Sequence, residues 1–214
     1  MMNATPFERP GVRGFLHRPA VPGADGLVLT HGAGGDCNSP SLVAAAEAFE
    51  VAGLHVLRCD LPFRQRRPKG PPSPSTAARD RAGLREAVAA MRALVRGRVF
   101  LGGHSYGGRQ ATLLAAEELD MAAGLLLFSY PLHPPGKAER LRTEHFPLLS
   151  VPAVFVHGTR DSFGSIDELR RAVAAIPAPA QIVTIDGAGH DLRKGRFDLG
   201  PVVAALLASV LNAG

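Results

Sequence analysis

The chain has 214 residues, of which 46% are hydrophobic and 20% charged, a balance typical of a globular domain with a large core. No apolar run approaches the ~20 residues that a membrane span needs, and residues 1–10 lack the apolar segment of a signal peptide. We therefore expect a single domain over residues 1–214, in the cytoplasm and without a membrane partner. The net charge is +5, but no nucleic-acid-binding motif accompanies the scattered arginines, so no nucleic-acid partner is expected.

Short apolar runs alternate with longer helical patterns along the chain. The expected strands are 27–30, 55–59, 99–101, 125–128, 153–156 and 181–185, and an extended segment at 12–17 is expected to add an antiparallel edge. The expected helices are 41–52, 77–95, 106–119, 166–176 and 202–211. Continuously apolar strands separated by helices predict an α/β fold, with helices on both faces of a mostly parallel sheet. The active site of such a sheet lies beyond the carboxyl ends of its strands.

A glycine-rich turn follows the third expected strand. Residues 102–108 read Gly-Gly-His-Ser-Tyr-Gly-Gly, and a helix is expected directly after them. A strand, a G-x-S-x-G turn and a helix in this order are typical of a nucleophile elbow, which predicts Ser105 as the nucleophile. Side chains in place of Gly103 or Gly107 would collide with neighbouring segments in so tight a turn. The alternative is a serine that only caps the helix.

A serine hydroxyl needs an adjacent base to attack a carbonyl carbon, and the order in this arrangement is serine, acid, histidine. Asp161 follows the end of the fifth expected strand, and His190 lies in a loop of small residues after the sixth. We therefore predict Asp161 as the acid and His190 as the base. Asp186 remains an alternative acid, whereas Asp191 is adjacent to the histidine and cannot easily orient its ring.

Other polar residues near the predicted site have different expected roles. His104 is expected to pack under the turn, and His157 is expected to be structural because it ends a buried strand. His133 and His145 lie in a segment at the rim, where they contact substrate at most. Arg109, just after the nucleophile turn, is expected to pair with an acid for structural reasons.

The first expected strand ends in His-Gly-Ala-Gly-Gly-Asp at residues 31–36. A fold with a nucleophile elbow takes one oxyanion-binding N–H from such a loop and another from the residue after the nucleophile. We therefore predict the N–H groups of Ala33 and Tyr106 as the oxyanion hole, with Gly34 as the alternative to Ala33. Each donor of this kind contributes about 10² to 10³ in rate.

Two further segments are expected at the catalytic edge. Residues 63–69 carry Arg64, Arg66 and Arg67, whose guanidinium groups suit a carboxylate or phosphate of an anionic substrate, or the tail of an acyl thioester. A solvated basic loop, or a set of internal salt bridges, explains the same residues equally well. The proline-stiffened residues 130–147 replace a full lid, so a minimal lid and an open site are expected.

The two cysteines, Cys37 and Cys59, form neither a disulfide framework nor a metal-binding pattern. We expect both to be inert, partly buried thiols. No metal or cofactor is implied by any motif of the chain.

Six segments that span almost the whole chain carry a family resemblance: HGAGGD at 31–36, LPFRQRRPKGPP at 61–72, GGHSYGGRQA at 102–111, SYPLHPPGK at 129–137, HGTRDSFG at 157–164 and GAGHDL at 187–192. They resemble the α/β-hydrolase superfamily, specifically its small dienelactone-hydrolase-like branch. Within it, the chain looks like bacterial relatives of the testis-expressed and chromatin-complex-subunit hydrolase-like domains. Dienelactone hydrolases use a cysteine nucleophile whereas position 105 is serine, so dienelactone cleavage is not expected.

The motifs together predict a serine hydrolase that cleaves small ester or thioester substrates through an acyl-enzyme, as a monomer or homodimer. The alternative from a different class is an interaction module that keeps the fold without the activity, because some larger members of the resembled group look like parts of assemblies. A peptidase is a third possibility, disfavoured by the lack of a propeller or a large lid domain.

Overall fold

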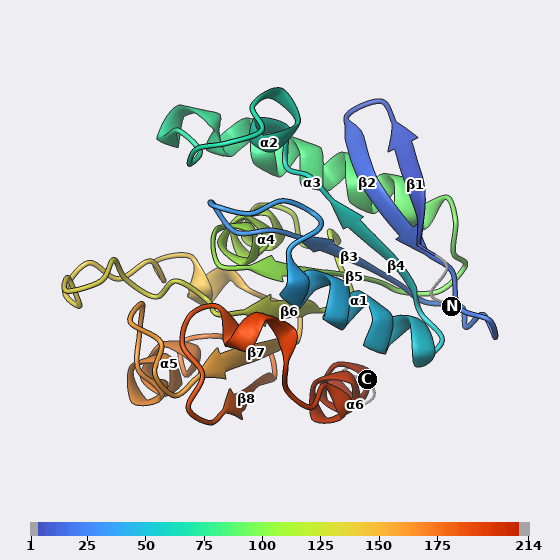
Figure 1. Ribbon diagram of the computed structural model, residues 1–214. Helices are drawn as coiled ribbons and strands as arrows, with labels where there is room; N and C mark the ends of the chain where they lie inside the picture. The colour runs from blue at the N-terminus through green and yellow to red at the C-terminus, as the bar shows by residue number, and fades with distance from the viewer. Residues whose placement is uncertain (1–3, 210–214) are drawn as a thin grey trace.

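The computed structural model describes residues 4–209, which form one twisted sheet covered by helices (Figure 1). The strands are β1 Ala4–Arg9, β2 Val12–His17, β3 Gly26–Thr30, β4 His55–Cys59, β5 Val99–His104, β6 Leu125–Phe128, β7 Ala153–Gly158 and β8 Ala180–Ile185. They are ordered β1-β2-β4-β3-β5-β6-β7-β8. All neighbours from β4 to β8 are parallel, whereas β2 pairs antiparallel with both β1 and β4. The predicted α/β fold with a mostly parallel sheet is confirmed.

Helices cover both faces of this sheet. One face packs on α1 Pro40–Val51 and α6 Gly200–Ser209, and the other on α3 Ala77–Arg92, α4 Tyr106–Glu117 and α5 Ile166–Val173. The shorter helical turns are α2 Pro62–Arg66, η1 Pro74–Thr76, η2 Phe146–Leu148 and η3 Leu192–Gly195. Among the helices of residues 4–209, none combines the length and the hydropathy that a bilayer crossing requires.

The central strands are apolar throughout because both of their faces are buried. In β5, Val99 and Leu101 belong to the core beneath α3 and α4, while Phe100 between them belongs to the core beneath α1. All three side chains are at most 4% exposed. A strand in this position has no solvated face, so alternation between polar and apolar residues is absent.

Several predicted boundaries differ from those observed. The segment at 12–17 is an antiparallel strand, but β1 pairs outside it and forms the edge. The sequence of β1 did not indicate a strand because most of its residues are exposed and only Phe7 is buried. Helices α3 and α5 end three residues earlier than predicted, at Arg92 and Val173. The helix predicted at 202–211 is α6, and residues 210–211 lie outside the described residues.

The sheet order creates a crevice at the carboxyl ends of β3 and β5. The chain passes from β3 to β4 on one side, and then crosses to β5 on the other side of β3. Ligands of parallel sheets bind at such a reversal, where the loops after the two strands diverge. Among residues 4–209 no separate lid is seen over this edge, and the loop that joins β6 to β7 contains the turn η2 as its one helical element.

Candidate active site

Ser105 occupies the turn between β5 and α4 in a strained backbone conformation. Its φ of 50° and ψ of −113° lie in a region that residues with a Cβ rarely adopt. A Cβ added at Gly103 or Gly107 would stand 2.6 Å from a carbonyl oxygen at the end of β3, that of Thr30 or His31 respectively. The predicted collision at both glycines is confirmed, and it explains why the turn needs them.

A chain of hydrogen bonds joins Ser105, His190 and Asp161. The Nε2 atom of His190 lies 2.8 Å from Ser105 Oγ, and its Nδ1 lies 2.8 and 3.0 Å from the two carboxylate oxygens of Asp161. An ionised carboxylate only accepts hydrogen bonds, so Nδ1 carries the proton of the neutral ring. The lone pair of Nε2 then accepts the hydrogen bond from the serine hydroxyl.

The alternative acids make other contacts. Asp186 accepts a hydrogen bond from Thr159 Oγ1 at 3.3 Å, and Asp191 accepts one from the backbone N–H of Arg193 at 3.0 Å. Within residues 4–209, neither carboxylate is hydrogen-bonded to His190. Of these three acids, the structure therefore brings Asp161 alone against the imidazole.

Asp161 stays ionised although its side chain is fully buried. Burial favours the neutral acid, but the hydrogen bond from His190, the positive charge it can carry and the N–H of Phe163 at 2.8 Å together lower the pKa of the carboxyl below its ordinary value. The ring of Phe163 also stacks on the imidazole, with the two ring centroids 4.1 Å apart. Phe163 therefore contacts both members of this pair, although the motif HGTRDSFG that contains it had suggested no role for it.

His104 contacts the loop that carries His190. Its Nε2 donates to the backbone oxygen of His190 at 2.8 Å. Burial lowers the pKa of His104 to about 4, so the ring is neutral and the donating nitrogen keeps its proton at neutral pH. His104 thus packs under the turn as predicted, and it also makes a specific hydrogen bond. This bond joins residues 86 positions apart, so a local sequence pattern does not predict it.

The loop at residues 31–36 is held rigidly beside Ser105. His31 Nδ1 donates to the carbonyl oxygen of Gly32 at 2.8 Å, and Arg64 Nη2 donates to that of Ala33 at 3.0 Å. The peptide bond is planar and trans, so fixing these two carbonyl groups also fixes the N–H groups of Ala33 and Gly34 on the opposite side. Tyr106 is the first residue of α4, where a backbone N–H has no acceptor within the helix.

Arg64 lies beneath this loop and not in the site. It is 4% exposed, and its three nitrogens donate to four backbone carbonyl groups. These belong to Ala33, Gly35, Arg67 and Gly70, at 2.8 to 3.2 Å. All four hydrogen bonds of the guanidinium are made to the protein's own backbone. Arg64 therefore has a structural role in place of the predicted substrate contact.

The other residues considered for substrate binding lie outside the cavities beside Ser105. Arg66 and Arg67 are exposed, and Arg67 donates to the carbonyl oxygen of Pro71. His133 is buried, donates from Nδ1 to the carbonyl oxygen of Pro134 at 2.9 Å, and has Nε2 at 3.6 Å from a carboxylate oxygen of Glu168. The structure does not bring these three residues to Ser105.

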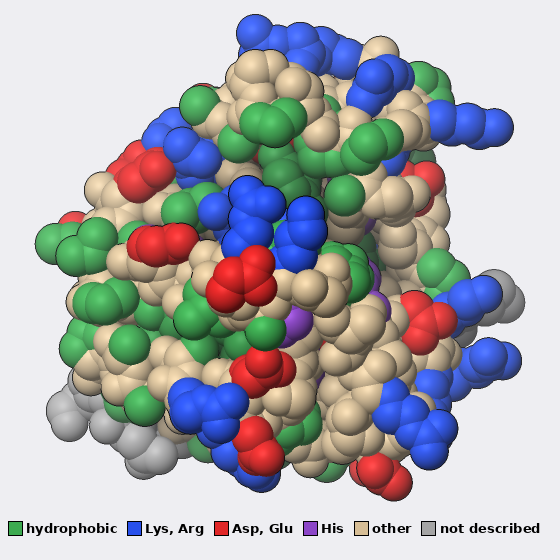
Figure 2. Space-filling view, turned by 90° about the vertical axis from the view of Figure 1, so that its left-hand side faces the viewer, with side chains coloured by type: hydrophobic (Ala, Val, Ile, Leu, Met, Phe, Trp, Pro, Cys, Tyr) green, Lys and Arg blue, Asp and Glu red, His purple; other side chains and the backbone are tan. Residues whose placement is uncertain are grey.

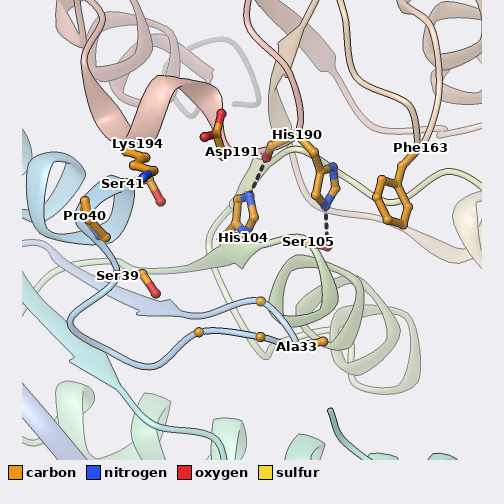
Figure 3. Close-up of a pocket in the computed structure, with 13 residues that line it drawn as sticks. Ala33, Ser39, Pro40, Ser41, His104, Ser105, Phe163, His190, Asp191 and Lys194 are labelled. Carbon is orange, nitrogen blue, oxygen red and sulfur yellow. Dashed lines mark hydrogen bonds between the residues drawn. The ribbon is translucent and has the colours of Figure 1, made fainter. Parts of the chain in front are cut away.

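Two cavities meet at Ser105, with volumes of about 500 and about 450 Å³. Ala33, Ser105 and Phe163 line both of them. The first extends past His190 towards the start of α1 and Lys194 (Figure 3), and the second extends past Tyr106 towards η1. Figure 2 views the molecule from this edge and shows histidine side chains near the centre of the face, with both basic and acidic side chains around them.

The two cysteines are free and buried. Burial is the largest of the effects that raise the pKa of both thiols, to about 12. Thiols with so high a pKa carry almost no nucleophilic thiolate at neutral pH, which agrees with the expectation that they are inert.

The sheet, the strained serine and its histidine and aspartate neighbours define the class of α/β-hydrolases. The model of a family described as an alpha/beta hydrolase domain matches residues 24–208, and the chain belongs to this family. The superfamily resemblance is thereby confirmed, while the narrower resemblance to testis-expressed and chromatin-complex-subunit domains stays a prediction.

Solved structures with the same fold include three bacterial proteins. An α/β serine hydrolase homologue from Coxiella burnetii is 18% identical, with 99% of this chain and 97% of that chain covered and a TM-score of 0.70. A dienelactone hydrolase from Anabaena variabilis is 22% identical, with 98% and 95% covered and a TM-score of 0.68. A serine hydrolase without a lid from Xanthomonas campestris is 17% identical, with 99% and 94% covered and a TM-score of 0.72. At these identities the likeness concerns the fold.

Proposed function

We propose that this chain is a serine hydrolase that cleaves carboxylic esters or thioesters of small acyl substrates. The observation that carries the proposal is the 2.8 Å hydrogen bond between Ser105 Oγ and His190 Nε2, with the opposite ring nitrogen bound to Asp161. A structural serine has no need of a base whose tautomer is set by a buried carboxylate.

In the first half of the reaction, Ser105 Oγ attacks the carbonyl carbon and His190 Nε2 takes the hydroxyl proton. The carbonyl oxygen becomes an oxyanion, which the N–H groups of Ala33 and Tyr106 stabilise together with the positive end of the α4 dipole. Collapse of the tetrahedral intermediate breaks the bond to the leaving alcohol or thiol, which receives the proton from His190. The acyl group remains bound to Ser105 as an ester.

In the second half, water attacks the acyl-enzyme and gives its proton to the same Nε2 atom. The second tetrahedral intermediate collapses to release the carboxylic acid, and the proton returns to Ser105. Asp161 stabilises the imidazolium in both halves. The two cavities that meet at Ser105 offer separate spaces for the acyl part and for the leaving group of a substrate.

Covalent labelling by a fluorophosphonate probe tests this proposal without knowledge of the substrate. We expect the wild type to be labelled rapidly and the Ser105→Ala variant not to be labelled. Ser129, whose buried hydroxyl lies outside both cavities, provides a matched serine: Ser129→Ala should label like the wild type. Absence of labelling in well-folded wild type would overturn the proposal and favour an interaction module that keeps the fold.

A further inference from the structure

The cavity on the Tyr106 side of Ser105 is lined by positively charged side chains and by no acidic one. Arg109 and Arg142 line it, and no Asp or Glu does. Within residues 4–209 neither arginine forms an ion pair, so the structural partner expected for Arg109 is not found. The other cavity differs in this respect, because it is lined by both Lys194 and Asp191.

Two buried hydrogen-bond donors at this cavity have no acceptor among the described residues. They are Nε of Arg109 and Nε2 of Gln110, whose side chain is 0% exposed. The amide of Gln110 has one possible orientation, because its Oε1 accepts a hydrogen bond from Arg81 at 3.2 Å and a guanidinium can only donate. Its Nε2 therefore faces away from Arg81. Buried donors without acceptors are rare in proteins, and both of these belong to residues that line this cavity.

The two guanidinium groups lie close enough to affect each other. Burial, and next the charge of Arg109, lower the pKa of Arg142 below its ordinary value. An anion between them would remove this repulsion. The only hydrogen bond from the Arg142 guanidinium within residues 4–209 is a long one of 3.5 Å to the carbonyl oxygen of Pro131, so most of its donors are available to such an anion.

The walls of the cavity are apolar and rigid, and both properties favour the binding of a charged group at a fixed position. Pro71, Pro72, Pro74 and Pro131 line it, and their rings are apolar and stiff. Electrostatic attraction is stronger beside such apolar walls than in open water. The nearby carboxylate of Asp80 does not line the cavity: it is buried and accepts hydrogen bonds from the backbone N–H of Phe63 at 3.0 Å and from the Tyr106 hydroxyl at 2.8 Å.

We propose that this cavity is a carboxylate-binding subsite, in which Arg109, Arg142 and Gln110 hold an acid group of the substrate next to Ser105. The inference rests on the proposed hydrolase function and narrows its substrates to esters or thioesters that carry a second, ionised carboxyl group. A planar carboxylate matches the paired N–H groups of a guanidinium.

Two matched substrate pairs test the subsite on either side of the scissile bond. The para-nitrophenyl monoester of glutaric acid, compared with para-nitrophenyl butyrate, places the carboxylate on the acyl side. Para-acetoxybenzoate, compared with para-acetoxybenzamide, places it on the leaving group. We expect the wild type to prefer the anionic member of at least one pair by about tenfold or more in kcat/KM, the usual range for a charge-assisted hydrogen bond.

Arg109→Gln and Arg142→Gln should each lower this preference by about tenfold while hydrolysis of the neutral member persists. Arg171→Gln removes the same charge from an exposed position on α5 and should leave the preference unchanged. Equal rates on both members of each pair in the wild type, or a preference that survives both cavity substitutions, would overturn the subsite.

Direct binding separates this inference from the proposed function. If neutral esters are cleaved and the probe labels Ser105 but no anionic preference exists, only the subsite is wrong. If neither cleavage nor labelling occurs, titration calorimetry with glutarate still tests the subsite: wild type should bind it and Arg142→Gln should bind it at least about tenfold more weakly. Binding of inorganic phosphate without binding of glutarate would overturn the choice of a carboxylate.

Discussion

The carboxylate of Asp161 illustrates how neighbouring groups set the state of a single residue. It has no solvent exposure, and in isolation such an acid would favour its protonated form. The Nδ1–H of His190 and the backbone N–H of Phe163 both point at it, and the balance keeps it ionised. The same contacts fix the tautomer of the histidine, so the acid acts on Ser105 through the ring between them.

Asp161→Asn tests this arrangement at the residue scale. The amide presents an N–H to the histidine or favours the wrong tautomer, so we expect kcat on a neutral ester to fall by about 10⁴ with an intact fold. Asp186→Asn is the matched control, because that exposed carboxylate does not contact His190, and it should change kcat less than about twofold. Steady-state kinetics with thermal unfolding measure both effects. A larger loss for Asp186→Asn would assign the acid to that position.

At the scale of elements, the loop after β3 is positioned by the helical turn α2. Arg64 comes from α2 and donates to Ala33 and Gly35, while His31 at the other end of the loop accepts from the N–H of Leu61 at 3.1 Å. The segment after β4 therefore supports the loop after β3. Two neighbouring strand ends act as one unit, and the predicted oxyanion donor depends on both.

Arg64→Lys measures the importance of this support. A lysine ammonium cannot reach the four carbonyl groups that the planar guanidinium serves, and buried acceptors are left unpaired. We expect the free energy of unfolding to fall by about 2–3 kcal/mol and kcat to fall by about tenfold. Arg66→Lys, at an exposed position on the same turn, should change neither. Lost preference for anionic esters at unchanged stability would instead assign Arg64 to substrate binding.

At the scale of the whole molecule, folding keeps several histidines neutral. Burial lowers the pKa of His104 and of His145 to about 4, and it also lowers the pKa values of His17, His31 and His55. A histidine with a depressed pKa in the folded state binds its proton more readily in the unfolded chain. Its contribution to stability is therefore complete above about pH 6.5 and is lost as the pH falls towards 4.

Urea unfolding between about pH 7.5 and about pH 4.5 checks this expectation, since the two values bracket the unfolded histidine pKa. As the pH falls over this range, the protonation of His104 and that of His145 should each lower the free energy of unfolding by at most roughly 3 kcal/mol, because one pH unit corresponds to about 1.36 kcal/mol. His145→Gln, which keeps an amide donor facing Thr112, should reduce the slope of stability against pH. An unchanged slope in this variant would show that the pKa of His145 is the same in the folded and unfolded states, which would contradict the lowered value.

The sequence by itself determined the order of the central strands and helices along the chain and the residues of the nucleophile turn. Both follow from short-range physics: buried parallel strands are continuously apolar, and a strained serine needs glycines two positions away on either side. Asp161 and His190 were predictable because residues that follow parallel strands gather at one edge. The edge strand β1 was missed because its exposed residues leave no apolar pattern.

Only the tertiary structure decided which side chains meet across the sheet. The hydrogen bond from His104 to His190 spans 86 positions, and the one from Arg64 to Ala33 spans 31. Whether an arginine supports a loop or faces a cavity depends on such long-range contacts, since its residue type is the same in both cases. This is why Arg64 proved to be structural, while Arg109 and Arg142, distant in sequence, line one cavity beside the nucleophile.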